Sequence, residues 1–188
     1  MASAEPKTAK TKRAYIGMGS NEGDRVGYVQ QSMQLLKDIP GVEIVECSSL
    51  YETEPTGGQY SRWFVNAVAA IDTSLKAVDL LDVCRDIEAR LNEMHGGARS
   101  QRGSKERTRI IDMDILFYGS EVVKDDYLVV PHPHLHERAY ALVPMLEIAP
   151  DFSHPSFGKT ITELHEELPE PELVYLYGTR QEEEGEDS

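Results

Sequence analysis

The sequence has few cysteines and no long apolar run. Only two of its 188 residues are cysteine, Cys47 and Cys84, and both lie in apolar-patterned segments without paired spacing. A disulfide framework or a cysteine-based zinc site therefore has no support, and we expect both to be reduced core residues. No stretch approaches the ~18 apolar residues of a membrane span, and residues 1–12 lack the apolar core of a signal peptide. These absences predict a cytoplasmic protein without membrane contact.

Basic side chains are also scarce. The chain has 19 Lys and Arg residues against 33 Asp and Glu residues, and its formal net charge is −14. Affinity for nucleic-acid phosphates depends on clustered basic side chains, so this balance argues against a nucleic-acid partner. By composition, residues 178–188 are predicted to be a disordered acidic tail and residues 1–10 a disordered N-terminal segment.

Internal repeats and Pro-rich linkers are absent, so residues 11–177 are predicted to form one domain. Apolar periodicity predicts strands at 13–18, 42–51, 63–73 and 110–118, a short apolar segment at 121–123, and helices from Asp24 to Pro40, at 77–94 and at 136–147. This order is typical of the ferredoxin-like α+β fold, in which helices pack on one face of an antiparallel sheet.

Two carboxylates share one face of the strand predicted at 110–118. In the run IIDMDILFY, Asp112 and Asp114 point one way, and the apolar side chains at the alternating positions point the other: Ile111, Met113, Ile115 and Phe117. Such a pair can converge on Mg²⁺, a hard cation that takes its remaining ligands from water and substrate phosphates. The alternative is that both are ordinary residues of an exposed strand face.

A basic segment directly precedes this strand. Residues 97–109 hold five basic side chains and one acidic side chain. Phosphoryl transfer needs cationic groups that stabilise oxygens gaining charge, and the Gly and Ser content favours a loop that closes over a triphosphate. The alternative is a solvated surface loop, which the neighbouring aspartates disfavour.

Two further patterns carry less weight. Residues 17–21 resemble a phosphate-binding loop but lack the Gly-Lys-Ser/Thr end of a Walker sequence and the spacing of a dinucleotide fingerprint. His132, His134 and His136 alternate with Pro and Leu and have no cysteine partner, so a zinc site is a minor alternative.

Several motifs together resemble one family. They are AYIGMGSNEGDR, SSLYETEP, FVNAV, the Asp112-x-Asp114 strand and VVPHPHLHERAYALVPMLEIAP. They follow the order found in the 6-hydroxymethyl-7,8-dihydropterin pyrophosphokinases of folate biosynthesis, and the resemblance covers residues 13–164. It implies a ferredoxin-like fold, a monomer or weak homodimer, and transfer of pyrophosphate from MgATP to the pterin hydroxymethyl group with release of AMP.

The resemblance also implies roles for individual residues. Asp112 and Asp114 would hold two Mg²⁺ ions against the phosphates of ATP. The pterin would lie between the aromatic plates Phe64 and Tyr140, surrounded by Thr53, Pro55, Thr56 and Asn66. The nucleotide would contact Glu88, Ile115, His132 and Arg138. Catalytic cations on the phosphates would be Arg99 and Arg109.

The segment before the paired aspartates departs from the family pattern, which usually reads Arg-Trp-Gly-Pro-Arg. Residues 105–109 read KERTR and contain no Trp. Arg102 and Arg107 are therefore alternatives to Arg99, whereas Arg109 is fixed by its position three residues before Asp112. Pro133 also replaces an aromatic residue that some members have.

Two other function classes fit parts of the pattern. A nucleotidyltransferase also pairs a Gly-Ser turn with an Asp-x-Asp strand around Mg²⁺, but it places them on neighbouring elements. Here Gly19 and Ser20 lie about 90 residues before Asp112. A nucleotide-binding regulatory module with the same fold and no turnover is the non-enzymatic alternative.

Overall fold

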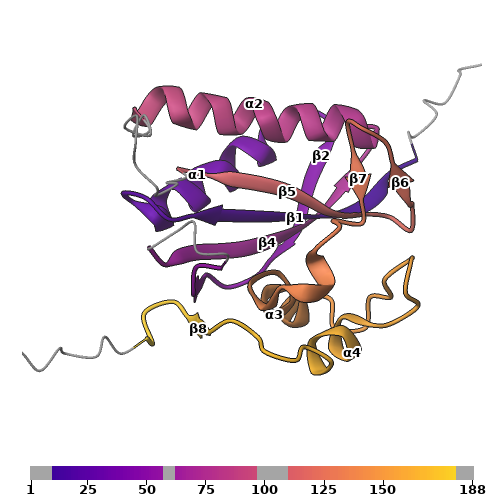
Figure 1. Cartoon of the computed structure of the whole chain (residues 1–188). Coiled ribbons are helices and arrows are strands. Elements are labelled where there is room, and N and C mark those ends of the chain that lie inside the picture. Colours follow the sequence, from indigo (N-terminus) through magenta and orange to yellow (C-terminus); the bar gives the residue numbers. More distant parts are fainter. Residues whose placement is uncertain (1–9, 57–61, 97–109, 181–188) are drawn as a thin grey trace, which may run out of the picture.

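The main sheet of the protein is antiparallel and is built around a central pair of strands, β1 (Lys12–Ser20) and β4 (Phe64–Thr73) (Figure 1). The computed structural model describes residues 10–56, 62–96 and 110–180. On the far side of β1 lies β5 (Asp112–Tyr118). The far side of β4 pairs with β2 (Val42–Cys47) and β3 (Tyr51–Thr53), and β3 pairs in turn with β8 (Val174–Leu176). A separate hairpin joins β6 (Val123–Lys124) and β7 (Val129–Val130).

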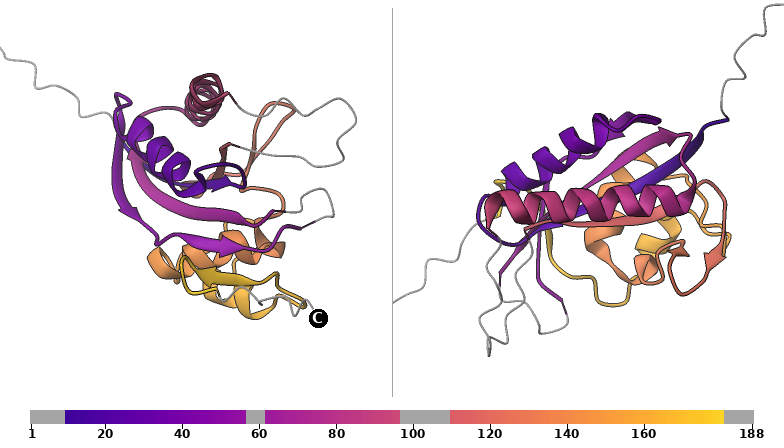
Figure 2. Two further views of the ribbon diagram at one scale, coloured as in Figure 1. Left: turned by 90° about the vertical axis from the view of Figure 1, so that its left-hand side faces the viewer. Right: turned by 90° about the horizontal axis from the view of Figure 1, so that it is seen from above.

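Helices cover both faces of this sheet (Figures 1 and 2). The first face packs against α1 (Arg25–Lys37) and α2 (Ala77–His95), with Leu36, Leu80 and Leu91 fully buried. The order β1, α1, β2 with β3, β4, α2 and β5 along the chain is the predicted ferredoxin-like one. The prediction of helices on one face holds for α1 and α2 but not for the helix predicted at 136–147. The opposite face carries η1 (Leu135–Glu137), α3 (Ala139–Ile148) and α4 (Ile161–Glu166), which bury a second core around Phe117 and Leu142.

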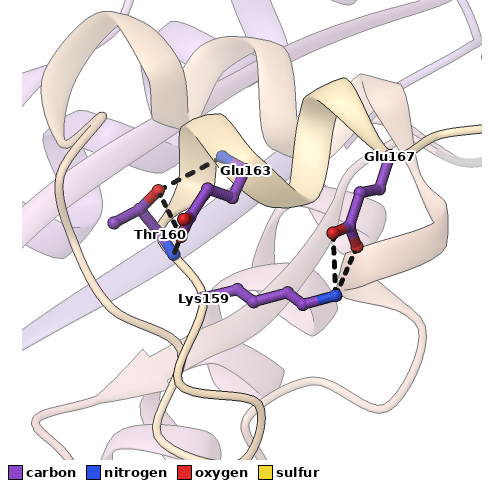
Figure 3. A network of polar contacts seen from close by, with 4 residues as sticks. All are labelled: Lys159, Thr160, Glu163 and Glu167. Atoms are coloured by element: carbon purple, nitrogen blue, oxygen red, sulfur yellow. Dashed lines mark hydrogen bonds and ion pairs between the residues drawn. The ribbon is translucent and has the colours of Figure 1, made fainter.

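Local signals in the sequence explain where the helices begin and end. Asp24 caps α1, because its carboxylate accepts a hydrogen bond from the Gly27 amide at 2.9 Å. Gly96 ends α2 in the left-handed conformation at φ 60°, which glycine adopts without strain. The short helix α4 starts with a capping box between Thr160 and Glu163, shown in Figure 3 beside the ion pair of Lys159 with Glu167.

The strand predicted at 42–51 is split into β2 and β3. At the break, the Ser48 amide donates a hydrogen bond to the Val68 carbonyl at 2.8 Å, while the Val68 amide donates to Ser48 Oγ at 2.9 Å instead of to a backbone carbonyl. The expectation that both cysteines are core residues is wrong for Cys47, which is exposed, while Cys84 is fully buried. The reason is that β2 pairs with β4 alone, and most of its residues face solvent.

Strand β5 contains a bulge that the alternating pattern did not predict. Its pairing with β1 shifts between Tyr15, which lies opposite Phe117, and Ile16, which lies opposite Ile115. The extra residue, Leu116, reverses the alternation, so Phe117 packs in the core opposite to that of Ile115. The prediction that Phe117 points with Ile115 is therefore wrong.

The remaining expectations concern the chain ends and the membrane. The predicted disordered segments 1–10 and 178–188 lie outside the described residues, apart from residue 10 and residues 178–180. Within the part of the chain that the structure describes, no helix is long and apolar enough to cross a membrane.

A histidine is buried beside the second core. His154 is 3% exposed, its ring lies 5.3 Å from that of Phe117, and its Nδ1 accepts a hydrogen bond from the Ser156 amide at 3.1 Å. Burial, together with the nearby His136, lowers the pKa of His154 to about 4.

We expect the His154→Phe variant to show a flatter dependence of stability on pH. The unfolded chain, with a histidine pKa of about 6.5, binds the proton more readily than the folded chain. The parent protein should therefore lose stability as the pH falls from about 6.5 towards 4, by up to ~1.4 kcal/mol per pH unit from this group. Urea unfolding between pH 7 and 4.5 measures the slope, with His165→Phe as the control. Equal slopes in the parent and His154→Phe would contradict this expectation.

Candidate active site

A cavity of about 810 Å³, including the space open to solvent, lies where β1, β4 and β5 face η1 and the start of α3. Nine of the residues assigned by the family resemblance line it, namely Thr53, Thr56, Phe64, Asn66, Asp112, Asp114, His132, Arg138 and Tyr140. These residues come from segments far apart in the sequence. The fold therefore brings together most of the residues that the motifs assign to the pterin and the phosphates.

Strand pairing explains how the two halves of the cavity meet. In the sheet, Gly19 of β1 lies opposite Asn66 of β4 on one side and opposite Asp112 of β5 on the other. Gly17 lies opposite Asp114. The central strand thus places the amide of Asn66 on one side of a glycine surface and the two carboxylates on the other.

Asn66 is held in one orientation by its neighbour. Its Nδ2 donates a hydrogen bond of 2.5 Å to Thr53 Oγ1, and the two residues are 8% and 1% exposed. Because Nδ2 is engaged in this way, the orientation of the Oδ1 acceptor is fixed as well. The pair presents a preorganised polar edge inside a largely buried site.

The other wall of the cavity carries an aromatic ring and a cation. Burial, with the nearby Asp114, raises the pKa of Tyr140 to about 12, so its ring is a neutral phenol at physiological pH. Arg138 Nη1 donates a hydrogen bond of 3.2 Å to Thr56 Oγ1, which ties the start of α3 to the residues after β3. Burial also lowers the pKa of His132, which favours its neutral imidazole.

The aspartate pair suits a hard cation. Asp112 and Asp114 both line the cavity and are partly exposed, so water and phosphate oxygens can reach them. Among the described residues there is no group of three or more His, Cys, Asp or Glu side chains arranged to hold a metal ion. Two neighbouring carboxylates that water and phosphate oxygens can reach fit Mg²⁺, which usually keeps several waters and binds substrate phosphates.

Several assigned residues do not line the cavity. Ile115 is 4% exposed and packs in the core under α1 and α2. Glu88 of α2 accepts a hydrogen bond of 2.6 Å from the Met113 amide, at the outer edge of β5, and Pro55 is also absent from the lining. The predicted catalytic residues Arg99 and Arg109, with the alternatives Arg102 and Arg107, lie outside the described residues. The roles of all these residues stay predictions.

The cavity also contains residues that the sequence reasoning missed. Gly17 and Gly19 were read as part of a weak phosphate-loop pattern, yet both lie within strand β1 and form part of the lining. Their spacing of two residues on a predicted strand was the available signal, because it marks one face without side chains. The apolar lining residues Leu116, Leu135 and Ala141 carry no such signal.

We expect the Gly19→Ala variant to weaken pterin binding about tenfold, or ~1.4 kcal/mol. A Cβ at Gly19 would overlap Asn66 Oδ1, and this end of the Asn66 side chain can move aside without disturbing the backbone. The fold should therefore persist while the polar edge is displaced. Calorimetric titration with the pterin measures the loss. Gly17→Ala is the comparison, because its Cβ would instead meet Leu116 at 3.3 Å; an equal loss there would speak against the role of Asn66.

Known proteins resemble the chain over most of its length. The family model of 7,8-dihydro-6-hydroxymethylpterin-pyrophosphokinase matches residues 15–150. A relative from Methylorubrum extorquens, named 2-amino-4-hydroxy-6-hydroxymethyldihydropteridine pyrophosphokinase, is 44% identical over 139 residues, covering 74% of this chain and 84% of that protein. A relative of the same name from Haemophilus influenzae is 35% identical over 163 residues, covering 87% and 97%.

Comparison with solved structures gives evidence on the fold. A wild-type HPPK-DHPS chain of Plasmodium falciparum matches with a TM-score of 0.65 at 15% identity, over 85% of this chain and 45% of that chain. The present chain thus spans less than half the length of that protein. This likeness confirms the ferredoxin-like α+β fold. Because the family model covers well over half of the chain and the Haemophilus influenzae relative is matched almost from end to end, the chain belongs to the 7,8-dihydro-6-hydroxymethylpterin-pyrophosphokinase family.

Proposed function

We propose that the cavity between β1, β4, β5 and α3 is the active site of this pyrophosphokinase. Membership of the family makes the chain an enzyme of folate biosynthesis, a transferase that uses ATP as the donor of pyrophosphate. The observation that carries the assignment of the site is the meeting of Asn66 and the aspartate pair across Gly19. A polar edge for a heterocycle and a cation site for phosphates then lie side by side.

The pterin half of the site is formed by β3, β4 and α3. A flat heterocycle between the rings of Phe64 and Tyr140 would gain stacking energy from both. Asn66 Oδ1 and the backbone next to Thr53 would bind the amide-like edge of the pterin through hydrogen bonds. The neutral Tyr140 ring avoids placing a phenolate beside the aspartates.

The phosphate half is formed by β5 and the segment that follows β7 (129–130). When bound, Mg²⁺ would neutralise the phosphate charge of ATP and withdraw electrons from the phosphorus under attack. We propose two such ions, with Asp112 and Asp114 as their protein ligands. The neutral His132 and the cationic Arg138, which also line the cavity, would orient the nucleotide.

The proposed reaction depends mostly on how the two substrates are positioned relative to each other. The pterin hydroxymethyl oxygen attacks the β-phosphorus of ATP, the bond from that phosphorus to the α-phosphate oxygen breaks, and AMP leaves. Holding the two substrates in line makes the step effectively unimolecular. Arg109 and Arg99 are proposed to stabilise the charge that gathers on the phosphate oxygens.

The distance along the chain between Gly19 and Asp112 does not exclude the nucleotidyltransferase alternative. Gly19 lies directly opposite Asp112 in the sheet, although about 90 residues separate them in the sequence. What favours pyrophosphoryl transfer is the family match together with the pterin half of the cavity. A cytoplasmic monomer or weak homodimer without a nucleic-acid partner remains part of the proposal.

The test is AMP release from MgATP with and without 6-hydroxymethyl-7,8-dihydropterin. The proposal expects AMP only when both substrates and Mg²⁺ are present, in equal amount to the pterin diphosphate. A pterin without the hydroxyl group serves as the control for simple hydrolysis. AMP formed equally with this control, or pyrophosphate released in place of AMP, would contradict the proposed reaction.

A further inference from the structure

The C-terminal strap, residues 172–180, contains β8 and lies along the β3 edge of the main sheet (Figure 1, yellow). It follows the last residue matched by the family model, residue 150. Within the strap, β8 pairs with β3, so that Val174 lies opposite Thr53 and Leu176 opposite Tyr51. The strand that presents Thr53 to the cavity is therefore held on its outer side by the strap.

The first residues of the strap bridge the two walls of the cavity. Glu172 Oε1 accepts a hydrogen bond of 2.8 Å from the backbone amide of Tyr140. Next to it, the Leu173 amide donates to Glu54 Oε2 at 3.1 Å, and the Leu173 carbonyl accepts from the Glu54 amide at 2.9 Å. Tyr140, at the start of α3, and Glu54, directly after β3, both line the cavity.

The bond from Glu172 supplies a helix cap that α3 does not provide for itself. Tyr140 lies in the first turn of α3, where backbone amides have no acceptor within the helix. The N-cap residue Arg138 makes no side-chain cap hydrogen bond, whereas α4 is capped locally by Thr160 and Glu163. A carboxylate at this end also interacts favourably with the helix dipole. The position of the Tyr140 backbone thus depends on a residue 32 positions later.

The last residue of the strap, Arg180, contacts the residues that precede Phe64 and Thr53. The Arg180 guanidinium lies 4.5 Å from the centre of the Trp63 ring, and its Nε lies 3.4 Å from Glu52 Oε2. Arg25 binds the same two residues, through the Glu52 carboxylate at 3.0 Å and the Trp63 carbonyl at 2.8 Å. Trp63 directly precedes Phe64, so the strap contacts the chain beside both proposed aromatic plates.

We propose that the C-terminal strap sets the spacing and orientation of the pterin slot, with Glu172 as a positioning residue that acts through Tyr140. The proposal rests on the proposed function of the cavity. The phosphate half, formed by β5 and the segment that follows β7, makes no strand pairing with the strap, and Arg138 is held separately by its hydrogen bond to Thr56 Oγ1. Loss of the Glu172 contact should therefore weaken pterin binding and leave MgATP binding almost unchanged.

The test compares Glu172→Ala, Glu172→Gln and the parent protein by calorimetry with the pterin and with a non-hydrolysable MgATP analogue. Loss of the cap in Glu172→Ala should raise the Kd for the pterin about threefold to thirtyfold, the range of a lost helix cap. The Kd for the nucleotide should change less than about twofold, within the range of a surface substitution. Glu172→Gln keeps an acceptor oxygen and should restore most of the affinity. Glu170→Ala, an exposed glutamate of the preceding turn that does not line the cavity, is the matched control.

A second variant, Arg180→Ala, tests the contact at the other end of the strap. Arg180→Ala should weaken pterin binding less than Glu172→Ala does, because it acts on Phe64 only through Trp63. Normal pterin affinity in both variants, equal losses for both ligands, or a Glu172→Gln variant as weak as Glu172→Ala would overturn the role of the strap. If the parent protein itself does not bind the pterin, the proposed function fails together with the strap. If the parent binds and turns over while Glu172→Ala matches it, the strap alone is wrong.

Discussion

Asp114→Asn is expected to lower turnover more than tenfold, a loss of over ~1.4 kcal/mol of transition-state stabilisation, while the protein stays folded. The amide keeps the shape of the side chain but is a far weaker ligand for Mg²⁺. Asp112→Asn should behave in the same way, because both carboxylates line the same side of the cavity. Steady-state AMP release at saturating MgATP and pterin measures the effect.

The stability of the two variants separates a catalytic defect from a folding defect. Both side chains are partly exposed and the amide keeps the shape of the carboxylate, so the free energy of unfolding should change by less than about 1 kcal/mol. Asp126→Asn, an exposed aspartate between β6 and β7, is the matched control and should retain full turnover. Turnover within about threefold of the parent in both site variants, less than 1 kcal/mol, would rule out the metal assignment.

Asn66→Ala is expected to weaken pterin binding by about 5- to 150-fold, or ~1 to 3 kcal/mol, with little effect on the nucleotide. The substitution removes the acceptor that faces the slot and leaves the edge of the buried heterocycle unpaired. Because Asn66 Nδ2 also donates to Thr53 Oγ1, some loss of stability should accompany the loss of affinity. Calorimetry with each substrate and urea unfolding together measure these effects.

Ser48→Ala is the matched control for the Asn66 variant. Ser48 is buried and its Oγ accepts a hydrogen bond from β4 at the Val68 amide, but Ser48 does not line the cavity. It should lose stability and keep pterin affinity. If Asn66→Ala weakened both substrates equally, the proposed location of the pterin would be wrong.

Most helices and strands could be predicted because their signals are local. The cap at Asp24, the left-handed Gly96 and the spacing of buried residues along α2 each depend on a few neighbours in the sequence. The bulge at Leu116 and the break at Ser48 could not be predicted, because both depend on which strand lies alongside. The three-residue strand β8 exists only through its pairing with β3.

The capping box that starts α4 is a local signal in the sequence, but no helix was predicted there. The residues Thr160 to Glu163 read TITE, the pattern of a helix N-terminus. The helix has only six residues, too few for apolar periodicity to be visible. A short helix is thus better recognised by its cap than by its period.

The residues themselves indicated one half of the candidate site. Strand alternation alone placed Asp112 and Asp114 on one face, and both line the cavity. The pterin half required the family resemblance, because the bond between Thr53 and Asn66 depends on the pairing of β3 with β4. No local pattern marks Glu172, whose acceptor role follows only from the start of a distant helix.

The central position of β1 has a consequence for a chain that is still being synthesised. Gly19 leaves the ribosome before its neighbours in the cavity, Asn66 and Asp112, which follow about 50 and about 90 residues later. Closing such long loops costs entropy before any contact repays it, so these pairings form late in folding. A nascent chain that ends before these residues lacks part of the cavity lining. The substrates can therefore stabilise the finished domain by mass action, but they give no assistance to a chain whose synthesis is still under way.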